Sequence, residues 1–362
     1  MLRALAALSV LVYHARAEFW VGMREAFEAP SVSLDFLIAV LLWPFSLGWL
    51  GVPIFFLISG YCIHLSAARR LARREELSFR FVPYMRRRIL RIYPVFLAAL
   101  LLTGLLDWFS SGMPLAQYAS DNAYPFIVNL FMMQESLAPA YSFNNVLWTI
   151  SIEFHLYLFY PVVLWIVLRK GPLVALVSAA AISITTAVIY VALDLKSVFV
   201  HAHGGSPLFT SHLMIWVAGA YLAEVHAGRA RMPNGPKWHV TWVFSLIIGV
   251  FLQIKGQWGV SPLFLAIGSL GSVASAFWII ERYSIDKSLV GLALEKVGVM
   301  SYSLYATHRI TFEALAYIGI ADRHESIGPT IGYCLAAFVS AYLFFLLIER
   351  PTLYKASTIP KE

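Results

Sequence analysis

Residues 51–74, GVPIFFLISGYCIHLSAARRLARR, hold the pattern that decides the fold. Their first part, residues 51–68, contains no Asp, Glu, Lys or Arg. It comes close to the ~20 apolar residues that a membrane-spanning helix needs. The second part begins an arginine-rich loop, and such loops lie on the cytoplasmic side of a membrane. This segment therefore predicts a transmembrane helix and the side on which that helix ends.

The composition of the whole chain agrees with a membrane protein. Of its 362 residues, 60% are hydrophobic and 13% are charged, whereas a soluble domain has about 25% charged residues. The 18 Tyr and 11 Trp fit aromatic belts at two membrane interfaces. The net charge of +7 is concentrated in short loops, so it indicates topology and not a nucleic-acid partner.

Apolar runs of similar length recur along the chain and predict an all-α fold. We expect a polytopic transmembrane bundle of about ten helices, in one domain over residues 1–355 with a short cytoplasmic tail at 356–362. The expected helices cover residues 3–19, 50–67, 88–107, 144–168, 172–193, 207–226, 238–254, 261–281, 297–317 and 328–349. Residues 34–49 are apolar, but Asp35 and Pro44 interrupt them, so we expect an interfacial or re-entrant segment there.

The basic residues predict the topology. If the arginine-rich loop at 69–88 is cytoplasmic, alternate loops with Arg169–Lys170, Arg229–Lys237 and Arg282–Lys296 fall on the same side. The C-terminal tail carries Lys355 and joins them. We therefore expect a multi-pass protein with both termini in the cytoplasm.

Arg3 and His14 are polar residues in the first helix, where each charged side chain costs about 2.5–3.5 kcal/mol on insertion scales. Eleven residues correspond to about 1100°, or three turns to within about 20°, so the two side chains share one face about 16 Å apart. Arg3 fits an interfacial anchor. His14 near mid-membrane is either a packing residue or a functional one.

Arg88 and Arg91 share a face where the third helix enters from the cytoplasm. Guanidinium groups bind phosphates in bidentate geometry, as in a nucleotide or coenzyme A. Anionic lipid headgroups are the alternative partner for such arginines. The position of Arg91 favours a phosphate-binding site over lipid headgroups, because Arg91 already lies a turn inside an apolar helix.

A polar stripe runs along the fourth helix at four-residue spacing and includes Glu153 and Tyr157, with Trp148 beside it. A buried carboxylate must pair or be protonated. Pairing with His14 predicts an acid–base dyad in which Glu153 orients the histidine. The alternative is a hydrogen-bonding stripe that packs the helices together.

Two further polar positions lie in apolar runs. Ser59 offers a hydroxyl next to Gly60, although tight packing explains it as well. His308 is a second intramembrane histidine. Cys62 and Cys334 are expected to be small core residues, and we expect no metal site. By themselves, these features fit an acyl-transfer enzyme or a proton-coupled transporter.

The sequence resembles the acyltransferase-3 family of bacterial membrane acyltransferases. Six elements carry this resemblance along the whole chain, although Ala306 and Thr307 depart from the family's Leu-Trp before the late histidine. They are RALAALSVLVYHA (3–15), GVPIFFLISGYCI (51–63), RRILRIYP (87–94), LWTISIEFHLYLFYP (147–161), VGVMSYSLYATH (297–308) and IERP (348–351).

The resemblance implies an O-acyltransferase in the bacterial cytoplasmic (inner) membrane. It implies transfer of an acyl group, mostly acetyl, from cytoplasmic acyl-CoA to a sugar hydroxyl of a surface or secreted glycoconjugate. The acceptor would be a glycan or a lipid-linked glycan. An antibiotic or lipo-oligosaccharide acceptor is the alternative within the family, and a transporter or flippase for a lipid-linked glycan is the rival class.

The expected roles of these residues follow from their chemistry and from the resemblance to the family. His14 would be the general base or accept the acyl group transiently, oriented by Glu153. Arg88 and Arg91, with Arg3, would hold the coenzyme A phosphates. Ser59 or Tyr157 would donate a hydrogen bond to the oxyanion. Trp148 and His308 are expected to support the substrate or the structure.

Overall fold

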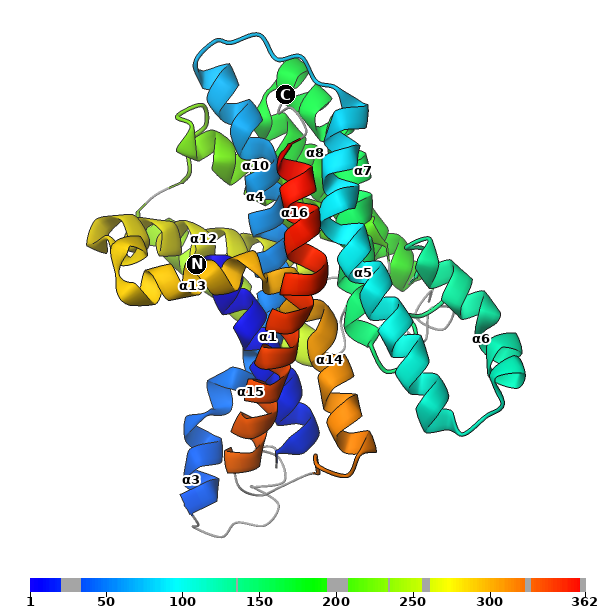
Figure 1. Cartoon of the computed structure of the whole chain (residues 1–362). Helices are drawn as coiled ribbons and strands as arrows, with labels where there is room; N and C mark the ends of the chain where they lie inside the picture. The colour runs from blue at the N-terminus through cyan, green and yellow to red at the C-terminus, as the bar shows by residue number, and fades with distance from the viewer. Residues whose placement is uncertain are drawn as a thin grey trace.

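The computed structural model describes residues 1–20, 34–134, 136–193, 208–233, 235–255, 261–322 and 327–358. Within these ranges the chain is helical (Figure 1), no strand is formed, and an isolated bridge joins Gln134 to Ala138. The all-α prediction is therefore confirmed.

The helices follow one another along the chain with short connections. They are α1 (Leu2–Phe19), α3 (Leu34–Leu41), η1 (Trp43–Leu50), α4 (Gly51–Ala72), α5 (Phe81–Ser111), α6 (Leu115–Leu130), η2 (Asn145–Leu147), α7 (Trp148–Lys170), α8 (Pro172–Ala192), η3 (Phe209–His212), α10 (Leu213–His226), α11 (Pro236–Ile254), α12 (Ser261–Tyr283), η4 (Ile285–Lys287), α13 (Leu289–Val299), α14 (Ser301–Tyr317), α15 (Ile327–Phe344), η5 (Phe345–Glu349) and α16 (Arg350–Ser357).

Every predicted span corresponds to a helix of the structure. In the described ranges, seven helical segments are long and apolar enough to cross a membrane, and the predicted number of about ten is approximate. They are Phe36–Ala72, Phe81–Ser111, Asn145–Lys170, Pro172–Tyr190, Pro236–Ile254, Ser261–Tyr283 and Ile327–Ser357. The helices α1, α10 and α14 fall outside this set, and α10 has only 14 residues.

The segment at 34–49, expected to be interfacial or re-entrant, forms two short helices, α3 and η1, that lead directly into α4. Each has eight residues, which is too short to cross a membrane alone. Three helices were not predicted: α6, α13 and α16. The helix α6 contains Pro125, and α16 continues the helical line of α15 and η5.

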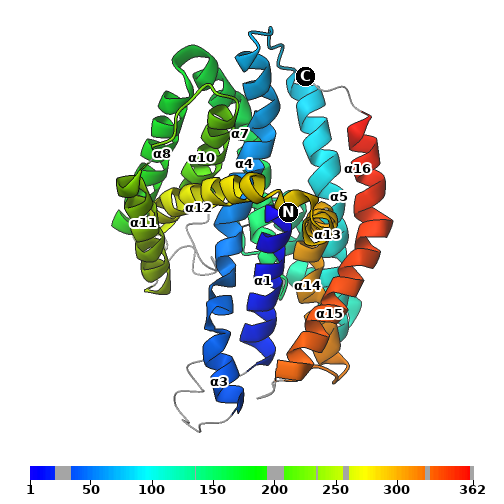
Figure 2. The same ribbon diagram turned by 90° about the vertical axis from the view of Figure 1, so that its left-hand side faces the viewer.

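The long helices run in two directions. In Figures 1 and 2, α4, α5 and the α15–α16 line follow the long axis of the molecule, whereas α12 and α13 lie across it. The α10 helix packs against α4 at one end, with α8 next to α10, and α1, α14 and α15 gather at the other end. The first and last parts of the chain therefore pack together.

Two glycines allow α4 and α10 to approach closely. A Cβ atom on Gly60 would overlap the carbonyl oxygen of Trp216, and one on Gly219 would overlap that of Leu57. Small residues permit such backbone contact between membrane helices, where van der Waals packing replaces the hydrophobic driving force. This contact places Ser59 of α4 beside the α10 helix.

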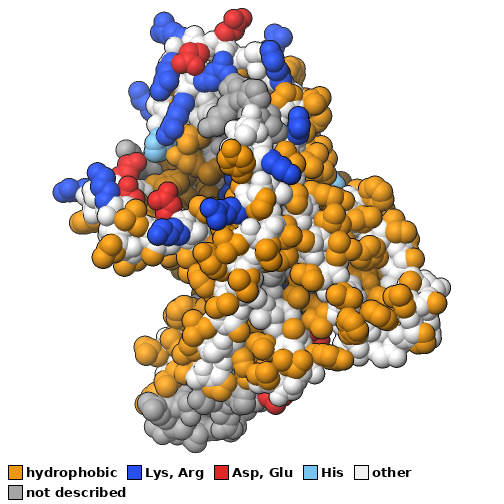
Figure 3. All heavy atoms as spheres, in the orientation of Figure 1, with side chains coloured by type: hydrophobic (Ala, Val, Ile, Leu, Met, Phe, Trp, Pro, Cys, Tyr) orange, Lys and Arg blue, Asp and Glu red, His pale blue; other side chains and the backbone are white. Residues whose placement is uncertain are grey.

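The surface is strongly apolar. Large hydrophobic side chains are exposed on α5, α8, α11 and α15, as expected for helices that face lipid. Figure 3 shows hydrophobic side chains over much of the face in view. The prediction that Cys62 is a core residue is wrong, because its side chain is exposed on α4. Cys334 is half-buried.

Lysine and arginine side chains gather at one end of the molecule (Figure 3). This end carries the loop between α4 and α5, while the N-terminus lies near mid-height beside α13 (Figure 1). The predicted loops at 194–206 and 255–260 lie largely outside the described residues. The cytoplasmic orientation of the arginine-rich end stays a prediction.

Candidate active site

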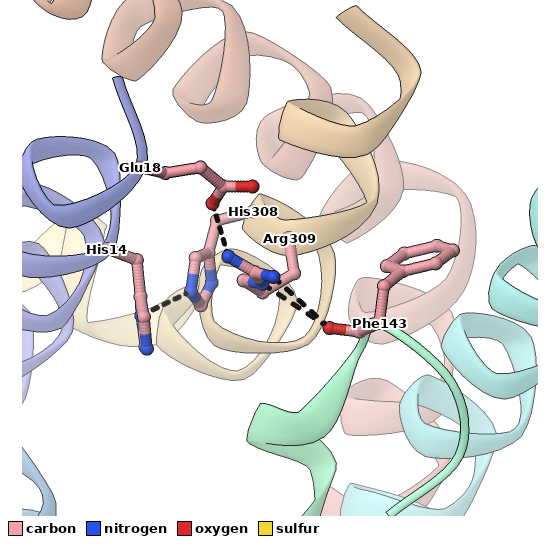
Figure 4. A network of polar contacts seen from close by, with 5 residues as sticks. All are labelled: His14, Glu18, Phe143, His308 and Arg309. Carbon is pink, nitrogen blue, oxygen red and sulfur yellow. Dashed lines mark hydrogen bonds and ion pairs between the residues drawn. The ribbon is translucent and has the colours of Figure 1, made fainter. Parts of the chain in front are cut away.

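The first polar cluster joins α1 to α14 around two histidines. The Nδ1 atom of His14 lies 3.0 Å from the Nε2 atom of His308 (Figure 4). Their ring centroids lie 5.0 Å apart, and the two ring planes are inclined by 27°. His308 is buried, and its Nδ1 atom lies 3.0 Å from the carbonyl oxygen of Leu304. We name these two side chains and the ion pair beside them the histidine cluster.

That ion pair also links α1 to α14. Arg309 donates to the Glu18 carboxylate, one turn beyond His14 on α1. Its Nε and Nη2 atoms each lie 3.4 Å from the carbonyl oxygen of Phe143, in the segment before η2 (Figure 4). Three segments that are distant in the sequence are therefore tied together next to His14.

His14 lines a cavity of about 660 Å³. Aromatic rings and two side-chain amides form much of its wall, and Trp148 lies at this wall with its ring 5.7 Å from that of His212. The other lining side chains of these kinds are Tyr13, Trp49, Phe56, Tyr305, Asn145 and Gln253. Such a mixture of flat apolar rings and amide groups suits a ligand that carries hydroxyl groups.

The second cluster surrounds Glu153 on α7. Tyr157 donates to its Oε1 atom at 2.6 Å, and Tyr302 of α14 donates to its Oε2 atom at 2.5 Å. The Tyr157 hydroxyl also lies 3.1 Å from the Oγ atom of Ser59. The predicted pair of Glu153 with His14 is therefore not formed: both carboxylate oxygens bind tyrosine hydroxyls, and His14 binds His308.

Three arginines complete this second cluster, which we name the arginine cluster. The guanidinium groups of Arg3 and Arg91 lie over the Tyr302 ring, 5.2 and 5.5 Å from its centroid. Arg88 lies 5.8 Å from the centroid of the Tyr157 ring. The structure thus brings together the three arginines that the sequence predicted as phosphate ligands, from α1 and α5.

Positive charge is in excess in the arginine cluster. Glu153 and Glu349 are the carboxylates that face it, and Glu349 accepts hydrogen bonds from the Ser303 amide at 3.0 Å and from its hydroxyl at 2.5 Å. Arg3 and Arg88 each keep a buried Nε atom without a hydrogen-bond partner. Three cations against two carboxylates, with free donors, form an electrostatic environment suited to a polyanion.

A smaller cavity lies beside the cavity of His14. Glu153 and Tyr302 line it on one side, and it shares Val52, Phe56 and Tyr305 with the cavity of His14. The two cavities are therefore adjacent, and these three side chains stand between them.

Several residues of this region escaped the sequence analysis. Glu18 follows His14 by four residues on the same face of α1, which is a signal that could have been noticed. No comparable signal marks Arg309 or His212, because they come from other helices and only the fold brings them near His14. Gln253 and Trp49 likewise reach the cavity through tertiary packing.

Two other histidines lie away from both clusters. His155 bonds to the Ser151 carbonyl oxygen at 2.8 Å and stacks on Phe209. His64 is fully buried, with its Nε2 atom 2.7 Å from the Oε1 atom of Glu224. The His64–Glu224 pair ties α4 to α10.

The fold describes a polytopic membrane protein whose bundle holds a pair of histidines and, next to it, a group of three arginines. A family model described as an acyltransferase domain matches residues 1–349. The chain therefore belongs to the acyltransferase-3 family, and it is a membrane enzyme that transfers acyl groups.

Relatives carry names of the same kind. Acyltransferase MdmB of Streptomyces mycarofaciens is 27% identical over 346 residues, which cover 92% of this chain and 81% of that protein. "Putative acetyltransferase ORF330" of Acidianus two-tailed virus is 27% identical over 148 residues, 40% of each chain. No solved structure matches this chain.

Proposed function

We propose that this enzyme transfers an acyl group, acetyl in the simplest case, from cytoplasmic acyl-CoA to a sugar hydroxyl of a surface or secreted glycoconjugate. The observation that carries the proposal is the pair of adjacent cavities: Glu153 and Tyr302 of the arginine cluster border one, and His14 borders the other. A reaction between a polyanionic donor and a neutral hydroxylated acceptor needs this separation of environments.

The arginine cluster is the donor site of the proposal. Arg88 and Arg91 lie on successive turns of α5, and Arg3 approaches from α1. Their guanidinium groups would bind the phosphates of coenzyme A, because charge-assisted bonds to phosphate are the strongest that these side chains make. Glu153 holds the two tyrosines against the arginines, so its role here is to organise the donor site and not to orient His14.

His14 is the general base of the proposal. It takes the proton of the acceptor hydroxyl while the hydroxyl oxygen attacks the thioester carbonyl carbon. The carbon–sulfur bond then breaks, and the sulfur leaves with the proton that His14 had taken. Ser59 and Tyr157 bond within the Glu153 network, away from His14, so the proposal gives them no hydrogen bond to the oxyanion.

The aromatic cavity is the acceptor site. Sugar rings present apolar faces that pack on aromatic side chains and hydroxyl groups that bond to amides, and this cavity offers both. If the arginine-rich end lies on the cytoplasmic side of a bacterial inner membrane, acyl-CoA would enter from the cytoplasm. The lipid bilayer and a glycan or lipid-linked glycan are then the partners of the enzyme.

Purified protein in lipid nanodiscs with radiolabelled acetyl-CoA tests this function. We expect thiol release that depends on a surface-glycan extract, with the label recovered in the glycan fraction as a base-labile ester. His14→Ala should abolish both signals. His155→Ala is the matched control, because His155 is also a helical histidine but touches neither cluster.

Two results would contradict the proposal. Label that appears in a macrolide antibiotic, offered in place of the extract, would move the acceptor to the small-molecule class. Thiol release that is equal with and without any acceptor, and unchanged in His14→Ala, would remove both the glycan and the base from the scheme.

A further inference from the structure

The contact between His14 and His308 determines which nitrogen of His14 can act. A backbone carbonyl oxygen only accepts hydrogen bonds. The Nδ1 atom of His308, 3.0 Å from the Leu304 carbonyl oxygen, must therefore carry a hydrogen. In the neutral ring the Nε2 atom of His308 is then a bare acceptor.

The same argument continues across the 3.0 Å contact to α1. Because His308 Nε2 accepts, the Nδ1 atom of His14 must donate and carries a hydrogen. Neutral His14 then has its lone pair on Nε2. Figure 4 shows this second ring nitrogen directed away from His308, and the His14 side chain lines the large cavity.

We propose that His308 is a positioning residue that holds His14 in the Nδ1–H tautomer, so that Nε2 receives the proton of the acceptor hydroxyl. The tautomer of His14 follows from the hydrogen-bond geometry alone. The role of Nε2 as proton acceptor rests on the proposed function. When His14 has taken the proton, its Nδ1–H still donates to His308. The contact therefore persists through the proton transfer and keeps the ring in place.

The surroundings explain why a histidine can take this position. A carboxylate at the place of His308 would be an additional buried charge, which is costly in a bilayer-embedded bundle. A neutral imidazole supplies the acceptor without that charge. The Leu304 carbonyl sets its tautomer, and the neighbouring Arg309 is tied to Glu18 and Phe143, so α14 is anchored next to His308.

One other acceptor lies near His14. The backbone carbonyl of Val10, one turn earlier on α1, also faces the ring. It is the competing determinant of the tautomer, because a helical histidine often bonds to the carbonyl four residues before it. The experiment must therefore separate the effect of His308 from that of Val10.

Nitrogen NMR of protein labelled with ¹⁵N-histidine, in nanodiscs at neutral pH, makes this separation. The difference between wild type and His14→Gln assigns the His14 signals among the 10 histidines. We expect one protonated Nδ1 and one bare Nε2 in wild type. In His308→Leu, which offers no acceptor, we expect signals of both tautomers, and in His308→Gln, which keeps one donor and one acceptor, the wild-type pattern.

His155→Leu is the matched control for the spectra, because it removes a histidine bonded in the same local way to a carbonyl four residues earlier. It should leave the His14 signals unchanged. An Nε2–H tautomer in wild type would overturn the inference. A single Nδ1–H tautomer in His308→Leu would also overturn it and assign the tautomer to Val10.

Activity supplies the second readout. We expect His308→Leu to lower kcat at least tenfold with an unchanged KM for acetyl-CoA, and His308→Gln to restore most of kcat. Equal kcat in Leu and Gln variants would overturn the positioning role. The NMR result needs no turnover, so a failure of the proposed function, seen as absent transfer by wild type, remains distinct from a failure of this inference.

Discussion

The histidine cluster and the arginine cluster lie in one helical bundle but are organised in opposite ways. In the histidine cluster, Arg309 is paired with Glu18, and His308 is bonded on both nitrogens. In the arginine cluster, three cations face two carboxylates, and buried donors remain unused. The charges of the first region are paired, whereas the second has more cations than carboxylates. This difference is what a division between chemistry and donor binding predicts.

The largest expected effect comes from His14 in the histidine cluster. His14→Ala should lower kcat by about 10²–10⁴-fold, the usual contribution of a general base. Binding of acetyl-CoA, measured by calorimetry in nanodiscs, should stay near wild type because the arginine cluster is intact. A variant that lost donor binding together with kcat would show that the two regions are not separate.

Substitutions in the arginine cluster should change the KM for acetyl-CoA and leave kcat almost unchanged. Arg88→Gln or Arg91→Gln should each raise the KM for acetyl-CoA by about 10–100-fold, since a bond to a charged group contributes about 1.5–3 kcal/mol. The change in kcat should be small. Comparison of acetyl-CoA with acetyl-dephospho-CoA in each variant would show which arginine binds the 3′-phosphate.

Arg73→Gln is the control for this pair of variants, because Arg73 is also an arginine of the basic end, with a side chain that is 74% exposed. It should change KM little. If Arg73→Gln raised KM as much as Arg91→Gln, the donor would be attracted by the general charge of this end and not by a built site.

Close helix packing supports the arginine cluster from α4. Gly60→Ala would push against Trp216 and displace Ser59 from Tyr157, and overpacking of this kind costs about 1–3 kcal/mol. We expect a lower midpoint of thermal unfolding in detergent. Gly332→Ala is the control, since nothing lies within 4 Å of the added carbon, and an alanine there should leave the midpoint equal or higher.

The smallest effect is expected for Glu153→Gln. Glutamine keeps one carbonyl oxygen that accepts from one of the two tyrosines, and its NH2 group can donate to the hydroxyl oxygen of the other. The kcat should therefore fall by less than about tenfold, and its dependence on pH should keep the shape of wild type. Glu153→Ala, which leaves both hydroxyls without their acceptor, should be more damaging. A loss of kcat in Glu153→Gln as large as in His14→Ala would restore the acid–base dyad that the sequence predicted.

Local patterns were sufficient for the helices and for many of the polar residues. Each predicted span is present because an apolar run of about 20 residues has few alternatives to a helix in a bilayer. Arg3, Arg88 and Arg91 could be selected because a buried charge is costly and stands out in an apolar run. The short helix α6, with its Pro125, gave no such signal and was missed.

The sequence by itself determined the class of fold, the approximate spans, and which polar side chains lie inside apolar helices. Only the tertiary structure decided their partners: Glu153 binds tyrosines, His14 binds His308, and Glu18 binds Arg309. Periodicity within one helix shows which face a side chain occupies. It contains no information on which of the other helices meets that face, because this depends on the packing of residues nearly 300 positions apart.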